Sequence, residues 1–388
     1  MTAPSASAQR FDQIVVGGGA MGLATAWQLA SRGSSVLLLE RYSPGHLRGA
    51  SHGATRNLNN AYDETHYLDL FDEAKHLYEE LERTSGATLL TLCGLVTHGA
   101  AENVHGAYTQ LTERGSRAEL VTNADARERW PGIAFEGDEV LFAAEAGRVH
   151  ASTTLETLVA SAQASGGDLR FGWNVTGISE SDDAITVTAV DPDGNSHRFT
   201  ADGAVVTGGA WSEQLLAAHV ALPTLRVTEV HPAHFAFRDT HAHLEAGWPS
   251  FNHFRGGSAT DPREGAAYSM LTPGEGVKVG LHVTGEAIDP DRRTFRGSDA
   301  WRQRLADYVA EFVPALDPAT GVELSCTYTS TPTGDFVLDR VGRITFGAGF
   351  SGHGFKFVPA IGRVLADAAT DVSLPPAPFR LAAHAARA

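Results

Sequence analysis

Residues 11–41 read FDQIVVGGGAMGLATAWQLASRGSSVLLLER and contain the most informative local pattern in the sequence. The apolar, β-branched run at 11–16 predicts a strand that is buried on both faces. A helix is predicted over 20–31 and a second strand over 36–39. The first strand and the helix are joined by three glycines with G-x-G-x-x-G spacing: Gly17, Gly19 and Gly22.

This spacing has a physical reason. Gly17 permits a tight turn, Gly19 lets the backbone approach a pyrophosphate, and Gly22 allows the helix to pack closely on the strand. The helix N-terminus offers NH groups and a positive dipole to the phosphates. Glu40, at the end of the second strand, is placed to accept hydrogen bonds from ribose hydroxyls. The segment therefore predicts a dinucleotide site, and at this point both FAD and NAD fit it.

Composition limits the class of protein. A chain of 388 residues is long enough for two domains with their own cores. The formal charge of -16 argues against nucleic acid or an anionic membrane as the main partner. No apolar stretch reaches the ~18 residues of a membrane span. Residues 1–10 lack the apolar core of a signal peptide and are expected to be a disordered leader, and two distant cysteines favour the reducing cytoplasm over a disulfide.

The rest of the chain predicts an α/β protein of two domains. Strand–glycine–helix units recur in the middle and at the end, and stretches typical of antiparallel strands lie between them. We expect a discontinuous Rossmann-like dinucleotide-binding domain with an inserted, antiparallel β-rich substrate domain. The expected boundaries are 11–95, 146–220 and 325–380 for the first domain, and 96–145 and 221–324 for the second.

Four further segments occur in a fixed order: SHGATR (51–56), GVKVGLH (276–282), CTYTSTP (326–332) and GAGFSGHGFKF (347–357). With the glycine fingerprint before them, the chain resembles the amine-oxidising flavoproteins of the D-amino-acid oxidase-like family. Within that family it is similar to the group of monomeric sarcosine oxidase and N-methyltryptophan oxidase. The resemblance extends over residues 11–372.

The resemblance implies a cofactor and a set of catalytic residues. The cofactor is FAD, attached through its 8α-methyl carbon to the thiol that falls on Cys326. Lys278 falls on the family's oxygen-activating lysine, although without the surrounding motif it would be read as an ordinary strand lysine. Arg56 and His52 match residues near the flavin ring. The substrate side is implied to include Tyr268 and His282.

The cofactor-binding residues implied by the fingerprint and the resemblance include both glycine-rich loops and several polar side chains. They are Gly17, Gly19, Gly22, Glu40, Arg41, Ser51, Thr55, Arg56, Val175, Gly208, Trp211, Cys326, Gly349, Gly352, Gly354 and Lys356. A helix is expected from about Phe355, with its positive end toward the flavin pyrimidine. Lys356 also matches the residue that pairs with a substrate carboxylate.

Two positions depart from the family pattern and limit the choice of substrate. Asn59 stands where members that bind small amino acids have an arginine, so a bidentate carboxylate clamp is missing. Thr228 and Glu229 stand where an arginine and a glutamine are common. We therefore expect a secondary amine or N-alkyl amino acid that is larger than sarcosine, or whose carboxylate is held by Lys356 alone.

The implied reaction is oxidation of a C–N bond, with a hydride equivalent passing to flavin N5, an imine product and reoxidation by O2 to H2O2. The implied state is a monomer with small-molecule partners only. Three alternatives stay open: a dehydrogenase that passes electrons to a partner, a primary amine oxidase of the glycine oxidase kind, and a flavin-binding module with little turnover. No metal is expected, because five nearby histidines lack tight metal spacing. They are His231, His234, His241, His243 and His253, interpreted as surface or pocket lining.

Overall fold

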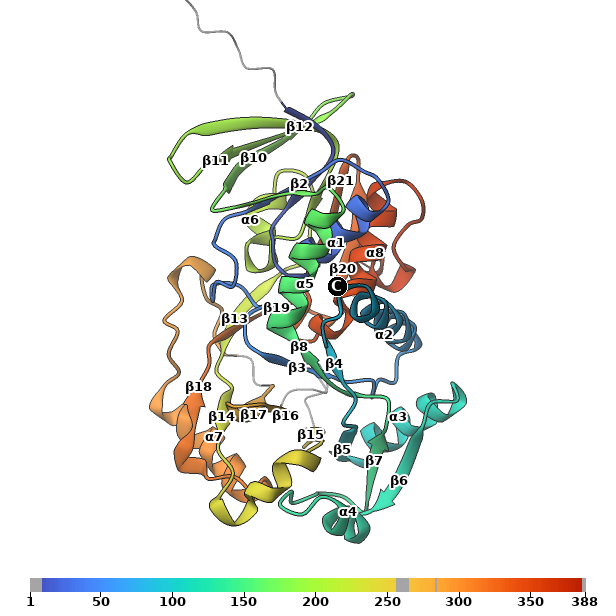
Figure 1. Cartoon of the computed structure of the whole chain (residues 1–388), viewed down its shortest axis with the longest axis vertical. Coiled ribbons are helices and arrows are strands. Elements are labelled where there is room, and N and C mark those ends of the chain that lie inside the picture. The colour runs from blue at the N-terminus through green and yellow to red at the C-terminus, as the bar shows by residue number, and fades with distance from the viewer. Residues whose placement is uncertain (1–8, 256–264, 283–284, 386–388) are drawn as a thin grey trace, which may run out of the picture. The chain divides into compact units, whose positions relative to one another are not determined.

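A computed structural model describes residues 9–255, 265–282 and 285–385, and they form two compact units (Figure 1). Unit 1 consists of Met1–His52, Thr154–Arg226 and Thr329–Ala388, and unit 2 of Gly53–Thr153 and Val227–Tyr328. Of the expected leader, residues 1–8 lie outside the described residues. The next two, Gln9 and Arg10, already belong to a strand.

Unit 1 is built on one mixed sheet. The strands β21, β12, β1, β2 and β9 run parallel in that order, with Val16 of β1 paired to Val206 on one side and Leu39 on the other. The antiparallel strands β10 and β11 extend the sheet beside β12, and β20 pairs with β21. The strands are β1 (Gln9–Val16), β2 (Val36–Glu40), β9 (Asp168–Phe171), β10 (Asn174–Glu180), β11 (Ile185–Val190), β12 (Ser196–Val206), β20 (Val337–Val341) and β21 (Ile344–Ala348).

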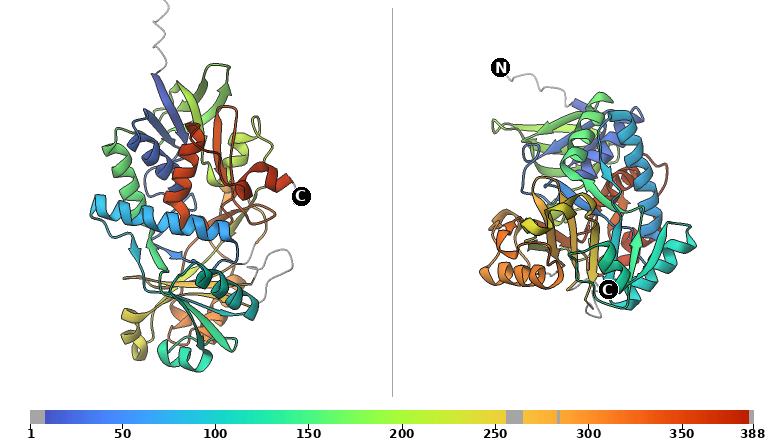
Figure 2. Two further views of the ribbon diagram at one scale, coloured as in Figure 1. Left: turned by 90° about the vertical axis from the view of Figure 1, so that its right-hand side faces the viewer. Right: turned by 60° about the horizontal axis from the view of Figure 1, so that its bottom comes forward.

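Helices α1 (Ala20–Ser31) and α8 (Val358–Ala369), from opposite ends of the sequence, pack together in unit 1 (Figure 2). Their contact is close because Gly362 has no side chain: a Cβ there would lie 2.6 Å from the Cβ of Ala24. Both helices are almost entirely buried, as expected beside a parallel sheet. The helices of this part of the chain are α1 (Ala20–Ser31), α5 (Ala151–Ala164), α6 (Ser212–Leu216), α8 (Val358–Ala369) and α9 (Leu381–Ala385).

Unit 2 is built on an eight-stranded, mostly antiparallel sheet with the order β18-β14-β17-β16-β15-β5-β7-β6. A small sheet, β3-β8-β4, accompanies it, and β13 pairs with β19. The strands are β3 (Thr55–Leu58), β4 (Leu90–Thr91), β5 (Leu95–Gly99), β6 (Ala118–Thr122), β7 (Glu139–Ala143), β8 (Gly147–His150), β13 (Arg226–Val230), β14 (Ala233–Phe235), β15 (Ser250–Phe254), β16 (Ala267–Thr272), β17 (Gly276–Leu281), β18 (Val322–Glu323) and β19 (Cys326–Ser330).

Helix α7 (Asp299–Phe312) of unit 2 is not among the elements predicted from the sequence. In α7, Ser298 caps the N-terminus by accepting from the NH of Trp301, and Leu305, Val309 and Phe312 follow on one buried face. Both signals are typical of a helix and could have been recognised. The helices of unit 2 are α2 (Thr65–Ser85), α3 (Ala101–Glu113), α4 (Asn123–Arg129) and α7 (Asp299–Phe312).

The two-domain α/β architecture with a parallel sheet and a largely antiparallel second sheet is confirmed. The boundaries differ from the expected ones, because residues 53–95 lie in unit 2 rather than with the fingerprint. The reason is strand pairing: β3 and β4 pair with β8, and β5 joins the eight-stranded sheet. Among the described residues, no helix has the length and apolar character needed to cross a membrane.

Candidate functional site

The predicted cofactor residues of unit 1 gather at one edge of its sheet. The fingerprint follows β1, Glu40 ends β2, Gly208 follows β12, and Gly349 follows β21. These four strands are parallel, so their carboxyl ends share an edge. In open α/β sheets ligands bind outside this edge.

Two of the fingerprint glycines, Gly17 and Gly22, are required by backbone conformation or close contacts. Gly17 has φ +101, and a Cβ on Gly22 would lie 1.8 Å from the carbonyl oxygen of Gly17. Thr207 donates its hydroxyl to that same carbonyl at 3.0 Å. Gly19 is the residue before α1, and the NH of Ala20 donates to Ser51 Oγ at 3.1 Å. Ser51, a predicted cofactor residue, is thus placed at the helix N-terminus.

Glu40 is buried at the end of β2 and faces the fingerprint. Its Oε2 accepts from the NH of Gly18 at 2.6 Å, and its Oε1 accepts from the NH of Tyr42 at 2.9 Å. A carboxylate offers about four acceptor positions. Its Oε1 also lies 3.5 Å from His46 Nε2, so Glu40 retains the capacity to accept from a ribose hydroxyl while it holds the loop.

Arg41 and Tyr42 follow Glu40 in the sequence and lie near Trp211. The Arg41 guanidinium carbon lies 5.2 Å from the ring centre of Tyr42 and 6.0 Å from that of Trp211. Trp211 and Tyr42 are themselves in tilted ring contact at 5.8 Å. Val175 is partly buried against the apolar core of the sheet. The structure thus brings Arg41 and Trp211 together and gives Val175 a packing role.

The second glycine loop, residues 349–354, lies beside the first. A Cβ on Gly354 would lie 3.0 Å from Met21 Cε, in the first turn of α1. Gly349 has φ +65, and a Cβ there would be 2.4 Å from Thr331 Cγ2. The expected helix begins as a 3-10 turn at Phe355–Phe357 and continues as α8. Lys356 is buried in that turn and donates to the carbonyl of His353 at 2.7 Å.

In unit 2 a single carbonyl holds the two predicted catalytic cations. The carbonyl oxygen of Thr55 accepts from Lys278 Nζ at 2.6 Å and from Arg56 Nη1 at 2.9 Å. Lys278 lies in the middle of β17 and is 3% exposed. A lysine on a surface strand would place its ammonium in water. The burial of Lys278 therefore excludes its interpretation as an ordinary surface lysine.

This environment lowers the pKa of Lys278 to about 7. Burial is the main cause, and the positive charge of Arg56 adds to it. The Cys326 thiol and the Glu275 carboxylate act in the opposite direction. Lys278 therefore changes its charge near neutral pH, which is the property expected of a group that gives and takes protons.

Tyrosine hydroxyls and an imidazole lie near these cations. The rings of Tyr268 and His282 are 4.8 Å apart, and His282 Nδ1 lies 3.1 Å from the Tyr328 hydroxyl. Gly280 makes room for Tyr268, because a Cβ there would be 2.4 Å from the phenol ring. Burial raises the pKa of Tyr268 to about 12, with a further increase from the Cys326 thiol that Arg56 and the Tyr328 hydroxyl oppose.

Cys326 opens β19, and its electrostatic partners include Lys278 and Tyr268. In a strand, residues two apart point to the same face, so Cys326 and Tyr328 share a face. Our sequence interpretation did not select Tyr328, although it lies within the CTYT segment. The alternation of side chains along a strand would have identified it.

The remaining predicted residues have less direct roles. Asn59 Oδ1 accepts from the NH of Ala61 at 2.7 Å, so its amide stabilises a local turn. His52 is partly buried and is the last residue of unit 1 before the chain enters unit 2. Three of the five clustered histidines (His231, His234 and His253) are buried, which corrects the surface interpretation for them. Each of these three is bound to a glutamate instead.

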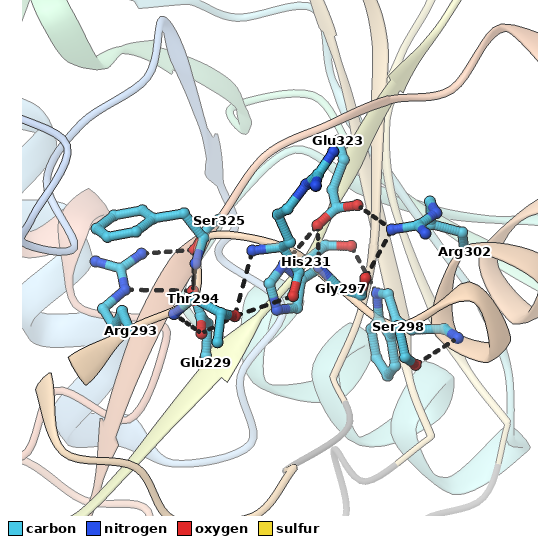
Figure 3. A network of polar contacts seen from close by, with 12 residues as sticks. Glu229, His231, Arg293, Thr294, Gly297, Ser298, Arg302, Glu323 and Ser325 are labelled. Carbon is cyan, nitrogen blue, oxygen red and sulfur yellow. Dashed lines mark hydrogen bonds and ion pairs between the residues drawn. The ribbon is translucent and has the colours of Figure 1, made fainter.

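Glu229, the second departure from the family pattern, belongs to a polar network that holds the residue before Cys326 (Figure 3). Its Oε1 accepts from Ser325 Oγ and from the NH of Phe295 at 3.0 Å. Arg293 completes the network by donating Nη2 to Ser325 Oγ at 2.7 Å and lies 3.5 Å from Glu229 through Nε. The network therefore holds the backbone directly before β19, which begins at Cys326.

We expect Arg293→Met to lower the free energy of unfolding by about 3 kcal/mol, because it leaves the buried Glu229 carboxylate without its cation. Urea denaturation measures this loss. The matched control is Arg302→Gln, whose side chain is 47% exposed in the same network and should cost less than about 1 kcal/mol. Equal losses in the two variants would contradict this account of the network.

The residues of unit 1 fit the dinucleotide half of FAD. Gly17 and Gly22 leave no room for a Cβ, the α1 N-terminus is positive, and Glu40 has acceptor capacity at the sheet edge. The residues of unit 2 fit the flavin ring system, which becomes negatively charged on reduction. The reason is that two basic side chains, Arg56 and Lys278, are held on one carbonyl.

Comparison with known proteins agrees with these features. The family described as "FAD dependent oxidoreductase" (DAO) matches residues 12–368. The monomeric sarcosine oxidase of Streptomyces avermitilis is 30% identical over 92% of this chain and 93% of its own. N-methyl-L-tryptophan oxidase of Yersinia pestis is 27% identical over 94% and 96%. The solved structure of NikD, described as an unusual amino acid oxidase, superposes with a TM-score of 0.80 at 26% identity over 94% and 95%.

Proposed function

This chain belongs to the DAO family of FAD-dependent oxidoreductases, and we propose that it oxidises the C–N bond of a secondary amine or an N-alkyl amino acid. When bound, FAD would supply the acceptor for a hydride equivalent from the carbon next to nitrogen, with O2 as the final electron acceptor and an imine and H2O2 as the products. The observation that carries the proposal is the buried Lys278 beside Arg56, on the carbonyl of Thr55.

We assign the adenine dinucleotide to unit 1 and the chemistry around the substrate to unit 2. In unit 1 the fingerprint, Ser51 and Glu40 would hold the pyrophosphate and ribose. In unit 2 the ammonium of Lys278 stabilises negative charge that develops on oxygen, as preorganised donors do in other enzymes. Arg56 favours the negatively charged form of the reduced cofactor.

Tyr268, His282 and Tyr328 are proposed to orient the amine. Their mutual contacts fix the rings, so a substrate meets hydroxyl and imidazole groups that need little reorganisation. With the pKa of Tyr268 raised to about 12, its phenol stays protonated and serves as a hydrogen-bond donor rather than a base. A neutral amine assists hydride departure with its own lone pair, so no general base is assigned.

Covalent attachment of FAD through Cys326 is part of the proposal. Cys326 is not part of a disulfide and lies among the electrostatic partners of Lys278 and Tyr268. The expectations of a monomeric, cytoplasmic enzyme stay predictions, and gel filtration tests the first of them.

The substrate is expected to be larger than sarcosine. Asn59 is engaged in a turn and has no charge, so Lys356 is the one predicted carboxylate partner. Anaerobic flavin bleaching with a panel of N-substituted amines and amino acids should give the highest kcat/KM for a member other than sarcosine. The kcat/KM for sarcosine is expected to be at least about tenfold lower than that of the best substrate, because part of a charged hydrogen-bond clamp for the carboxylate is missing.

The same panel tests the proposed reaction class. If sarcosine is the best substrate, the prediction that the substrate is larger than sarcosine is wrong. Bleaching by glycine or other primary amines but not by secondary amines would instead indicate a primary amine oxidase. A cofactor that no amine bleaches would contradict the function itself.

A further inference from the structure

Asn252 lies on the same face of the large sheet of unit 2 as two predicted active-site residues. It is the direct partner of Tyr268 in the antiparallel pair β15–β16. Met270, two residues after Tyr268, is the direct partner of Lys278 on β17. Direct partners share a face of a sheet, and so do residues two apart in one strand. Asn252, Tyr268 and Lys278 therefore point to one side, whereas Phe251 points to the apolar core on the other.

A hydrogen bond between two amides joins Asn252 to β3. Asn57 Nδ2 donates to Asn252 Oδ1 at 2.9 Å, and we call these two side chains the amide pair. Asn57 directly follows Arg56 in β3. The positive charge of Arg56 acts on both Lys278 and Tyr268. The amide pair is thus next to Arg56 along one strand and next to Tyr268 across the sheet.

The amide pair has one buried acceptor and one buried donor without a hydrogen-bond partner among the described residues, Asn57 Oδ1 and Asn252 Nδ2. A third such atom is Thr97 Oγ1, and Thr97 is the direct partner of Asn252 in the parallel pair β5–β15. Asn252 is 6% exposed and Thr97 is fully buried. Folded proteins pair nearly all of their buried polar groups, so three unpaired atoms in one place indicate a group that binds there.

The two unpaired atoms of the amide pair define the chemistry of that group. Asn57 Oδ1 can only accept a hydrogen bond, and Asn252 Nδ2 can only donate one. Turning both amides over would exchange these roles but would again leave one acceptor and one donor. A carboxamide offers the complementary NH and carbonyl oxygen. A carboxylate has no donor for Asn57, and an apolar group has neither.

The surroundings of the amide pair suit such a ligand. Asn57 is only partly buried, which leaves a side from which a ligand can approach. The ring of Tyr268 lies over Gly280, where a Cβ would be 2.4 Å from it. Gly280 and Asn252 flank Tyr268 on opposite sides, so the ring leans away from Asn252. Hydrogen bonds made to the shielded amide atoms are stronger than hydrogen bonds in water.

We propose that the amide pair recognises an uncharged carboxamide carried by the substrate amine. The substrate NH donates to Asn57 Oδ1, and the substrate carbonyl oxygen accepts from Asn252 Nδ2. The inference rests on the proposed oxidation of a C–N bond and names its substrate class, a secondary amine or N-alkyl amino acid that carries a neutral amide. Such a substrate is larger than sarcosine, as the uncharged Asn59 also indicates.

The first measurement compares substrates of equal shape on the unmodified holoenzyme. N-methyl-L-asparagine and N-methyl-L-leucine differ only in that a carboxamide replaces a branched hydrocarbon, and the same holds for N-methyl-L-glutamine and N-methyl-L-homoleucine. We expect the amide member of one pair to reduce the flavin anaerobically with a second-order rate constant about 10²-fold higher. The reason is that the apolar member leaves both buried amide atoms unpaired.

The double variant Asn57→Leu/Asn252→Leu tests the residues themselves. It removes both amides together, so no half-bonded partner is left in the protein, and such exchanges are nearly neutral for folding. The preference for the amide substrate should fall by about 10²-fold. The matched control is Ser269→Ala: Ser269 is fully buried on β16, and its Oγ also has no partner among the described residues. Ser269 is paired with Phe251 on the opposite face, so its loss should not change the preference.

The second measurement is independent of turnover. Succinamate and 4-methylpentanoate have the shapes of the first substrate pair but no amine, so they cannot be oxidised. Glutaramate and 5-methylhexanoate correspond to the second pair in the same way. Titration of the oxidised holoenzyme, followed by calorimetry and by flavin absorbance, should show that the amide of one pair binds at least about tenfold more tightly. The double variant should lose this difference, and Ser269→Ala should keep it.

The proposal is overturned if no pair of substrates or acids favours the amide, because the amide pair then only links β3 to β15 or binds water. It is also overturned if the double variant keeps the preference or if Ser269→Ala loses it. If N-methyl-L-homoserine reacts faster than both amide substrates, the pair selects an alcohol and the carboxamide assignment is wrong. The comparisons on the unmodified protein decide the question even if the double variant does not fold. Failure of the proposed function looks different: no secondary amine reduces the flavin, whereas the binding preference for the amide acid can still be measured.

Discussion

Replacement of Lys278 by methionine is expected to slow the reaction of the reduced enzyme with oxygen by about 10²–10³-fold, the cost of losing one preorganised charged donor. Methionine is similar in length and apolar, so it suits a side chain that is 3% exposed. Anaerobic reduction by the amine should be almost unchanged, because the proposed role of Lys278 is on oxygen rather than on the substrate. Stopped-flow measurement of the two half-reactions separates these effects.

The control for this variant is Lys75→Met. Lys75 lies on α2 and pairs with Glu79 at 2.5 Å, four residues along the same helix, so its loss should change neither half-reaction. If Lys278→Met reoxidises normally in air, oxygen is not the acceptor that Lys278 serves. The alternative of a dehydrogenase that passes electrons to a partner protein would then be favoured.

The pH dependence of reoxidation follows from the charge of Lys278. Its pKa is about 7, so the ammonium is present below that pH and is lost as the pH rises through it. The rate of reoxidation should therefore fall as the pH rises. A negatively charged reduced cofactor favours the ammonium, so the midpoint is expected at or above 7. The Lys278→Met variant should show no such transition.

Replacement of Cys326 by serine is expected to abolish covalent attachment of the flavin. A hydroxyl cannot replace the thiolate as the nucleophile, because its pKa is far higher. In the unmodified protein, yellow colour should stay with the polypeptide after acid precipitation. In Cys326→Ser all of the flavin should pass into the supernatant, as measured by its absorbance.

Cys93→Ser is the matched control for this experiment. Cys93 is also a cysteine of intermediate exposure outside a disulfide, but its contacts are Arg148 Nη1 at 3.7 Å and the neighbouring Gly94 carbonyl. It lies in no segment that resembles the family pattern. Flavin should stay attached in this variant, and release of the flavin from the unmodified protein would exclude covalent attachment altogether.

Much of the fold could be predicted because local patterns and tertiary contacts agree. The predicted helix at 20–31 is observed at Ala20–Ser31, and Glu40 ends the predicted second strand. The position of residues 53–95 could not be predicted from the order of elements. Strand pairing decides it, and the pairing of β3 and β4 with β8 has no signature in the sequence between them.

The sequence by itself determined the chemistry that is encoded in short, ordered segments: the glycine fingerprint, the resemblance to amine-oxidising flavoproteins, and the selection of Lys278, Arg56 and Cys326. Only the tertiary structure decided how these residues are tuned. Thr55 and Lys278 are 223 positions apart in the chain, yet one carbonyl holds the ammonium. Glu229 acquires its role through its contact with Arg293. Burial and charge act through space, and a linear sequence records neither the depth of a side chain nor its neighbours.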